Sequence, residues 1–277
     1  MFNIVGKRTF NADIFSLEFY MPAIAQNARS GHYVDIHMNL DTTALTLPVA
    51  ATDVEKGTFT IVQRAHDLAS EQLNMLNEGD EVFQIRGPLG SAGEFPQRNK
   101  ALLIAQDIGV ASLRSRAAEF QKKGTHTICV LGFATKDDVF WQDELSAVCD
   151  ELYVATEDGS FGLNGKVTGP IKAICETHKD VDQMLIITDL KPMKRAAKIA
   201  SDYNISASVC FDAVPQPTNG ENVFEIEGQS QETFEFGRAA KIDADAVDFD
   251  KLIARQKALT PVSQPTQDGD DHVASNS

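Results

Sequence analysis

The sequence has 277 residues, 43% of them hydrophobic, which is enough for two well-formed domains. Its 40 acidic and 25 basic residues give a formal charge of −15, which argues against nucleic acid and against an anionic membrane surface as partners. No apolar run approaches the ~20 residues that span a bilayer, and the first residues lack the pattern of a signal peptide, so we expect no membrane insertion.

The four cysteines lie 20 or more positions apart and include no C-x-x-C pair. Two of them, Cys129 and Cys210, stand in apolar, strand-like segments. Spacing of this kind predicts neither a zinc site nor an iron–sulfur cluster. We therefore expect reduced thiols, no metal site and a cytoplasmic location.

Residues 1–97 show the pattern of β-strands. Aromatic and β-branched residues, partly alternating with polar ones, occur in the segments FSLEFYM, HYVDIHMNL, GTFTIVQRA and DEVFQIRGPLG. Turn residues separate these segments, and one helical turn is expected near residues 68–76. Short strands at near-regular spacing predict a small antiparallel barrel.

The pattern changes after Pro96, and residues 98–211 alternate strands with helices. The strands are nearly continuous apolar runs: ALLIA, TICVLGF, ELYVAT, QMLIIT and ASVCF. Helices are expected near 110–123, 140–149, 168–178 and 192–203. This alternation predicts a parallel sheet that is covered by helices on both faces.

Residues 212–257 predict a C-terminal extension. It contains two strand-like pieces, NVFEIEG and ETFEFG, and a short amphipathic helix, VDFDKLIARQKA. The remaining residues, 258–277, are polar and acidic. This tail cannot bury enough apolar surface to offset the entropy lost on ordering, so we expect it to be disordered.

Four segments together resemble one protein family: GDEVFQIRGPLG, KALLIAQDIGVASL, ELYVATEDGSFGLNGKVTGPIK and VDFDKLIARQ. They are similar to the small subunit of NADH-dependent ferredoxin–NADP oxidoreductase and to sulfide dehydrogenase small subunits. Dihydroorotate dehydrogenase electron-transfer subunits are more distantly similar. The resemblance covers residues 1–257 and implies a ferredoxin–NADP reductase-like fold, in which an antiparallel Greek-key barrel precedes a nucleotide-binding-like α/β domain.

The resemblance also implies three cofactors, namely FAD on the barrel, a nicotinamide nucleotide on the second domain and a [2Fe–2S] cluster in the C-terminal extension. The family's FAD strand, Arg-x-Pro-Leu-Thr, corresponds to residues 46–50, where Pro48 remains but the arginine and the hydroxyl do not. The family's pyrophosphate turn, Gly-Lys-Ser-Thr, corresponds to residues 67–70. There Asp67 adds like-charge repulsion and a side chain where backbone should approach a diphosphate. We interpret the nearby Arg64 as a surface arginine rather than as a compensating cation.

The nucleotide turn of the second domain is altered in the same way. The family's Gly-Gly-Gly-x-Gly-x-Ala-Pro corresponds to residues 105–112, AQDIGVAS, in which Gly109 is the remaining glycine. Asp107 again directs a carboxylate to the position of a phosphate. The Gly-Pro that follows the fourth strand in the family is Asp189-Leu190 in this chain.

Two turns keep the family's residues. One is Gly87-Pro88-Leu89-Gly90, and the other begins Asp158-Gly159-Ser160. A fold needs such turn residues whether or not it binds a cofactor. We name no catalytic residue and no metal ligand. The candidate cofactor-binding positions are Pro48, Gly87, Pro88, Gly90, Gly109, Asp158, Gly159 and Ser160.

The family's cysteine cluster falls within residues 212–238, and this segment contains no cysteine. Without thiolate ligands we expect no iron–sulfur cluster. The residues leave FAD open and give no firm expectation of any cofactor.

The altered motifs leave three interpretations of the function, and they leave open whether the chain is an enzyme. In the first, the chain is a non-catalytic or regulatory subunit that docks onto a larger flavoprotein subunit, which by resemblance is similar to the small subunit of glutamate synthase. In the second, it is a working FAD-dependent subunit that passes electrons from NAD(P)H to a partner oxidoreductase, with Tyr33 or Phe59 facing the flavin. In the third, the old cleft accepts a cationic ligand between Asp67 and Asp107. We favour the first, because a chain without a retained surface would be expected to lose its fold signals as well.

Overall fold

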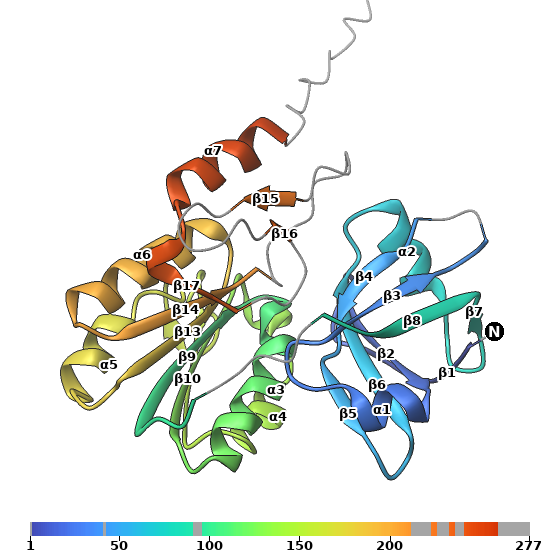
Figure 1. Cartoon of the computed structure of the whole chain (residues 1–277), viewed down its shortest axis with the longest axis horizontal. Coiled ribbons are helices and arrows are strands. Elements are labelled where there is room, and N and C mark those ends of the chain that lie inside the picture. Colours follow the sequence, from blue (N-terminus) through green and yellow to red (C-terminus); the bar gives the residue numbers. More distant parts are fainter. Residues whose placement is uncertain are drawn as a thin grey trace, which may run out of the picture.

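A barrel and an α/β domain lie side by side in the computed structural model (Figure 1). The structure describes residues 2–40, 43–90, 96–211, 223–225, 233–235 and 241–259. The predicted fold class, an antiparallel barrel followed by a parallel sheet with helices, is confirmed.

The barrel consists of two antiparallel sheets. The larger has the strand order β5-β6-β2-β1-β7 and the smaller the order β4-β3-β8. In chain order the strands are β1 (Phe2–Thr9), β2 (Ile14–Tyr20), β3 (Tyr33–His37), β4 (Leu45–Pro48), β5 (Ala51–Asp53), β6 (Thr58–Arg64), β7 (Glu81–Val82) and β8 (Gln84–Leu89).

Aromatic and branched side chains fill the barrel. Phe19 of β2 and Phe59 of β6 are fully buried, and their rings stack with centroids 5.4 Å apart. Helix α1 (Pro22–Asn27) follows β2. Helix α2 (Leu68–Met75) is the helical turn that the sequence predicts after β6.

The α/β domain is built on one sheet of order β12-β11-β10-β9-β13-β14-β17. The chain starts at the central β9, moves outward on one side and then returns to β13 on the other, so the order reverses beside β9. Open α/β sheets form a crevice at such a point. The strands are β9 (Lys100–Gln106), β10 (His126–Phe133), β11 (Glu151–Thr156), β12 (Leu163–Asn164), β13 (Gln183–Ile187), β14 (Ser206–Cys210) and β17 (Lys241–Asp243).

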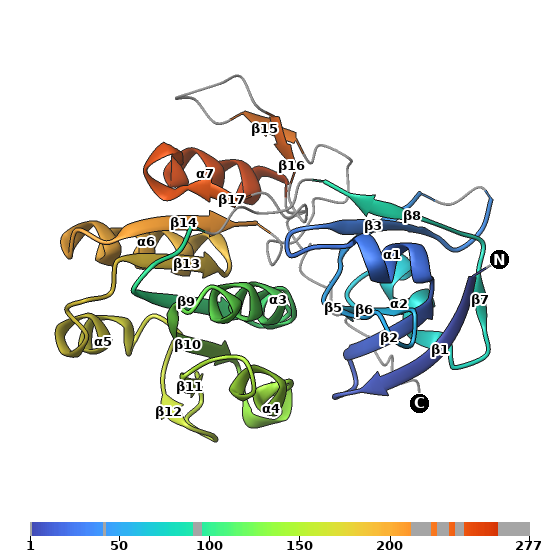
Figure 2. The same cartoon turned by 60° about the horizontal axis from the view of Figure 1, so that its bottom comes forward.

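These strands pair in parallel except for β17, which pairs antiparallel with β14. Helices cover both faces of the sheet (Figure 2). One face carries α3 (Gly109–Lys122) and α4 (Gln142–Ser146), and the other carries α5 (Ile171–Thr177), α6 (Leu190–Asp202) and α7 (Phe249–Leu259). Short 3-10 helices span Lys136–Asp138 and Ala244–Ala246, and β15 (Val223–Glu225) pairs with β16 (Thr233–Glu235).

Helix α4 is shorter than the helix predicted near 140–149. Trp141 has a φ of +54°, which places the preceding residues outside the helix. The other predicted helices of this domain agree with the structure to within a few residues.

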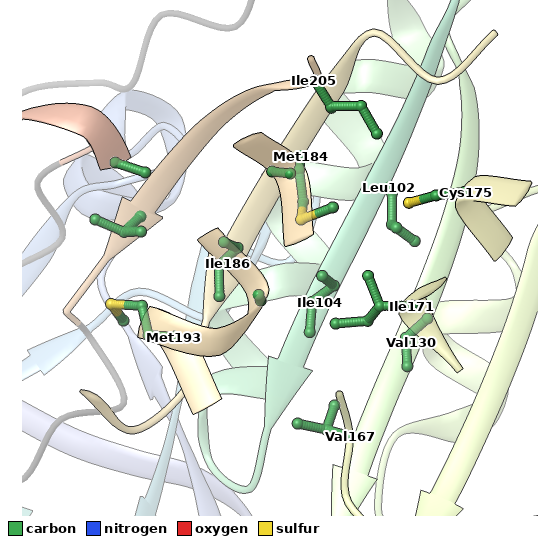
Figure 3. Close-up of a cluster of buried hydrophobic side chains, with 14 of the residues drawn as sticks. Leu102, Ile104, Val130, Val167, Ile171, Cys175, Met184, Ile186, Met193 and Ile205 are labelled. Carbon is green, nitrogen blue, oxygen red and sulfur yellow. The ribbon is translucent and has the colours of Figure 1, made fainter. Parts of the chain in front are cut away.

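Each face of the sheet has its own apolar core. On the face of α5 and α6, side chains of the strands and helices point toward one another, as Leu102, Ile104, Met184 and Ile171 do (Figure 3). The core on the α3 face also includes Ile14, Ala50 and Val62 of the barrel. The two domains are therefore joined by shared apolar packing.

Within the described residues no helix is both long and apolar enough to cross a membrane. Residues 260–277, most of the tail predicted to be disordered, lie outside the described part of the chain.

Candidate functional site

The carboxyl end of β9 meets the barrel at Asp107. This residue has a φ of +52°, in the left-handed region that glycine adopts without strain. Its N–H donates to the carbonyl oxygen of Gly132 at 3.0 Å, and α3 begins at Gly109, two positions later. The motif resemblance implies glycine at this turn, but the residue here is an aspartate whose side chain is 40% exposed.

Arg64, at the end of β6, holds the Asp107 carboxylate from the barrel side. Its Nη2 lies 2.7 Å from Oδ1 of Asp107 and its Nε lies 3.1 Å from Oδ2, which is a bidentate pair. Two further carboxylates, those of Asp13 and Asp138, each lie 3.6 Å from the guanidinium group. Arg64 is thus the centre of an ion cluster between the domains rather than the surface arginine that the sequence suggests.

The cluster also shifts the titration of Arg64. Partial burial alone would lower its pKa, but the hydrogen-bonded carboxylate of Asp107 and the charges of Asp138 and Asp13 raise that pKa above its usual value.

Neighbouring polar contacts extend the link between the domains. Asn11 Nδ2 donates to Asp138 Oδ1 at 3.1 Å. Together these contacts fix the β1–β2 turn against the loop that follows β10.

The rest of this edge of the sheet is acidic. Asp189 follows β13 and Glu157 follows β11. Burial in the site, together with the charges of Asp107 and Glu157, raises the pKa of Asp189. An additional anion at this edge would face the same repulsion.

The start of α2 is closed by its own side chains. The Asp67 carboxylate accepts the backbone N–H of Ser70 at 2.8 Å and the Ser70 hydroxyl at 2.6 Å. The same hydroxyl lies 3.1 Å from the backbone N–H of Asp67, so the two residues form a reciprocal capping box. Burial would raise the pKa of Asp67, but the hydrogen bonds from Ser70 hold it below its ordinary value.

The candidate turn at Asp158, Gly159 and Ser160 is exposed and internally bonded. The Asp158 carboxylate accepts the N–H of Ser160 at 3.0 Å and its hydroxyl at 2.6 Å. The Ser160 hydroxyl oxygen accepts the N–H of Lys136 at 2.8 Å, which ties the turn to the loop after β10. The glycine at 162 has a φ of +64°, and a Cβ there would lie 2.2 Å from the carbonyl oxygen of Val154.

The remaining candidate positions belong to the barrel and to α3. Pro48 ends β4, Gly87 and Pro88 lie in β8, and Gly90 directly follows β8. A Cβ on Gly87 would lie 2.7 Å from Val34, and one on Gly90 would lie 2.6 Å from the ring of Tyr33. Gly109 is buried at the first turn of α3. Close packing accounts for the glycines at 87 and 90, and a cofactor role for any of the eight candidate positions stays a prediction.

The two aromatic residues considered for a flavin differ in exposure. Phe59 is fully buried in the barrel core, so it offers no face to a ligand. Tyr33 is half-buried beside Gly90. The described residues contain no group of three or more His, Cys, Asp or Glu side chains that could hold a metal ion.

Comparison with known proteins places this arrangement in a family. The chain is 31% identical over 175 residues to the electron transfer subunit of dihydroorotate dehydrogenase B (NAD(+)) from Geobacillus thermodenitrificans, covering 61% of this chain and 67% of that protein. A Thermotoga maritima homolog of the same subunit is 31% identical over 176 residues, 64% of this chain and 62% of its own length. A chain of the NADH-dependent reduced ferredoxin–NADP oxidoreductase structure is 25% identical, with a TM-score of 0.79 and 93% coverage of both chains.

The chain belongs to the ferredoxin reductase-like electron transfer subunits. No family model matches it. The likeness in the sequence and the match over nearly the whole structure confirm the resemblance that the motifs indicate.

The start of α2 does not fit the diphosphate of FAD, which the family resemblance places there. Helix N-termini bind phosphate through free backbone N–H groups and a favourable dipole. Here the Ser70 N–H is already bonded to the Asp67 carboxylate, and that carboxylate has the charge of the ligand.

The turn between β9 and α3 does not fit the phosphates of a nicotinamide nucleotide. Asp107 fills the turn, and Arg64 is already paired with it. The N–H groups of Val110 and Ala111 donate to carbonyl oxygens of the same turn at 3.0 and 3.1 Å. At both positions where the motif resemblance implies a phosphate, the chain therefore has a carboxylate with protein partners of its own.

Asp67 and Asp107 can be identified from the sequence, but their hydrogen-bond partners are harder to recognise. An aspartate three positions before a serine at the start of a helix is a capping signal, so Ser70 could be recognised from the sequence. Arg64 and Asp107 are 43 positions apart in different domains, and no local pattern pairs them.

Proposed function

We propose that this chain is a non-catalytic, structural or regulatory subunit of a flavoprotein complex. It keeps the ferredoxin reductase-like fold and docks onto a larger flavoprotein subunit, similar to the small subunit of glutamate synthase, where the redox chemistry takes place. The observation that carries the proposal is the presence of a hydrogen-bonded carboxylate, Asp67 or Asp107, at each position where the family binds phosphate.

The expected repulsion between a carboxylate and a phosphate supports this proposal. Two like unit charges about 4 Å apart repel by about 1 kcal/mol in water and by about 4 kcal/mol at an effective dielectric constant near 20. About 1.4 kcal/mol changes a dissociation constant tenfold. Asp67 and Asp107 are partly buried, so solvent screens a phosphate beside either of them less than it would in bulk water. FAD and a nicotinamide nucleotide would each also have to replace hydrogen bonds that the protein makes with itself.

The proposal also excludes a resident iron–sulfur cluster. Residues 211–277 contain no cysteine, so this part of the chain has no thiolate to hold iron. The four cysteines that are present, the last of them Cys210, lie far apart in the sequence.

The alternative is a working FAD-dependent electron transfer subunit that passes electrons from NAD(P)H to its partner. One observation favours it. Gln106, directly before Asp107, has a buried Oε1 with no hydrogen-bond partner in the described parts of the chain. A bound nucleotide could donate a hydrogen bond to this oxygen.

The two functions differ in what the isolated chain can do. The chain is purified with its native partners and separately alone, and NAD(P)H oxidation is measured with added FAD and an artificial electron acceptor. We expect the isolated chain to give no oxidation above the rate of free FAD, and the complex to be active through the partner. Flavin-dependent oxidation by the isolated chain would overturn the proposal in favour of the alternative.

A further inference from the structure

A cavity lies at the junction of the two domains, apart from the acidic edge of the sheet. Its volume is about 270 Å³, and its walls come from α1 and β5 of the barrel and from α3 of the α/β domain. Figures 1 and 2 both show these elements side by side. None of the candidate cofactor positions lines it, and neither Arg64 nor Asp107 does.

The charge of this junction pocket is opposite to that of the molecule. Three cationic side chains line it, Arg29, Arg114 and Lys122, against one carboxylate, Glu119. Glu119 is already paired with Lys122, whose Nζ lies 3.0 Å from its Oε1. The two arginines therefore supply the net positive charge in a chain whose formal charge is −15.

Neither arginine has a carboxylate partner among the described residues. Arg114 lies over the ring of Trp141, with its Cζ 5.9 Å from the ring centroid, and this contact holds the side chain while leaving its N–H groups without an anion. Arg29 stands on the opposite, barrel wall. The pKa of His32 is lowered, mainly by burial of the imidazole and in addition by the positive charge of Arg29.

Two serines join the walls of the junction pocket. The hydroxyl oxygens of Ser30 and Ser115 lie 3.3 Å apart across the domain boundary, and Ser115 in turn donates to the carbonyl oxygen of Ser112 at 3.2 Å. Both hydroxyl protons are used in this chain of hydrogen bonds. The donors that remain for a ligand are the guanidinium groups, which match the geometry of phosphate oxygens.

We propose that the junction pocket binds a small phosphorylated anion between Arg29 of the barrel and Arg114 of α3. Its volume, about 270 Å³, is just below the usual range for sites of drug-sized molecules and suits inorganic phosphate or a short phosphomonoester rather than a dinucleotide. Because the two arginines belong to different domains, the bound anion also joins the barrel to the α/β domain.

The test is a calorimetric titration of the full chain with inorganic phosphate and with glycerol phosphate, at constant ionic strength. The variant Arg29→Gln/Arg114→Gln removes both guanidinium groups, and circular dichroism confirms that it is folded. Lys172→Gln/Lys191→Gln is the matched control, because it removes two charges from exposed positions outside the junction pocket.

We expect saturable binding by the wild type and by the control. The dissociation constant should rise by roughly tenfold or more in the arginine variant, since the charge-assisted hydrogen bonds to the anion are lost. The conservative variant Arg29→Lys/Arg114→Lys keeps the charges and is expected to weaken binding less than the glutamine variant. Absence of saturable binding by the wild type, or an equal loss in the control, would overturn the proposal.

Discussion

At the residue scale, Asp67 combines two effects on the start of α2. Its carboxylate satisfies a backbone N–H that would otherwise be available to an anion, and it adds a negative charge at the same place. The Asp67 carboxylate therefore stabilises helix α2 and at the same time disfavours the binding of a phosphate. A glycine at this position would leave the helix less well capped and open to a ligand.

The first prediction concerns Asp67→Ala. Loss of the cap should lower the free energy of unfolding by about 1 kcal/mol at neutral pH. The pKa of Asp67 is lowered in the folded protein, so its contribution is present above the unfolded pKa of about 3.9 and is lost as pH falls through the lower folded value. Urea unfolding at pH 7 and pH 3 measures this.

Asp67→Asn is the control, because asparagine caps helices about as well as aspartate. It should cost less than the alanine variant at neutral pH. An alanine variant that is equally destabilising at both pH values would show that the ionised carboxylate is not what caps α2.

A second prediction concerns cysteine reactivity. The interaction between the Cys129 and Cys149 thiols lowers the pKa of Cys149, and the same interaction together with burial raises the pKa of Cys129. Burial also raises the pKa of Cys175. Since the thiolate is the nucleophile, a thiol reagent should label Cys149 first in the folded protein. Mass spectrometry of limited labelling measures the order, and first labelling at Cys175 would contradict it.

At the element scale, turns are constrained by space as well as by φ. Gly162, in the turn between β11 and β12, and Gly124, after α3, both have positive φ, +64° and +73°. A Cβ at Gly162 would meet the Val154 carbonyl oxygen at 2.2 Å, whereas one at Gly124 would have nothing within 4 Å. Alanine at Gly124 therefore tests backbone strain alone, whereas alanine at Gly162 tests backbone strain together with a steric clash.

The third prediction compares alanine at these two positions. Gly124→Ala should cost about 1 kcal/mol, which is the strain of a left-handed residue. Gly162→Ala should cost about 2–4 kcal/mol, because overpacking against rigid backbone adds to the same strain. The free energies of unfolding in urea test this, and similar costs for the two variants would show that the turn after β11 relaxes freely.

Most elements could be predicted from the sequence because their patterns are local. Apolar runs identify β9, β10, β11, β13 and β14, and the change of rhythm after Pro96 separates the barrel from the α/β domain. Helix α1 and strand β17 are not predicted, since they have six and three residues and too little pattern of their own. They are fixed by packing against neighbours that are distant in sequence.

The candidate site is less predictable than the fold. Asp67 and Asp107 can be located from the sequence, at positions where the motif resemblance implies glycine. It cannot show that Asp107 takes a left-handed conformation or that Arg64 comes from the other domain to pair with it. Nor does any motif bring Arg29 and Arg114 to one pocket, because the domains have to dock before these residues meet.

At the scale of the whole molecule, the Arg64 cluster lies where the two domains of a reductase-like protein face each other. Arg64 is 27% exposed and contacts carboxylates from both domains. The domains are linked by protein groups, in addition to the apolar core that they share.

The fourth prediction is a double-mutant cycle of Arg64→Gln and Asp107→Asn, in which asparagine keeps the tolerance for positive φ. Because the ion pair is partly exposed to solvent, we expect its coupling energy to be only about 1 kcal/mol in the free energy of unfolding. Added salt should weaken this coupling. The exposed pair Lys56–Asp53, at 3.2 Å, is the control and should show no measurable coupling. Equal coupling in the two pairs would mean that the cluster does not hold the domains together.

We infer that this ferredoxin reductase-like chain does not itself carry the redox cofactors that the resemblance implies. The most direct test is to purify it from its native cells, record the visible spectrum and measure flavin and iron per chain after acid release. We expect a folded, colourless protein with neither flavin nor iron in amounts near one per chain. Flavin bands at near-stoichiometric content would contradict it and identify the chain as a working electron transfer subunit.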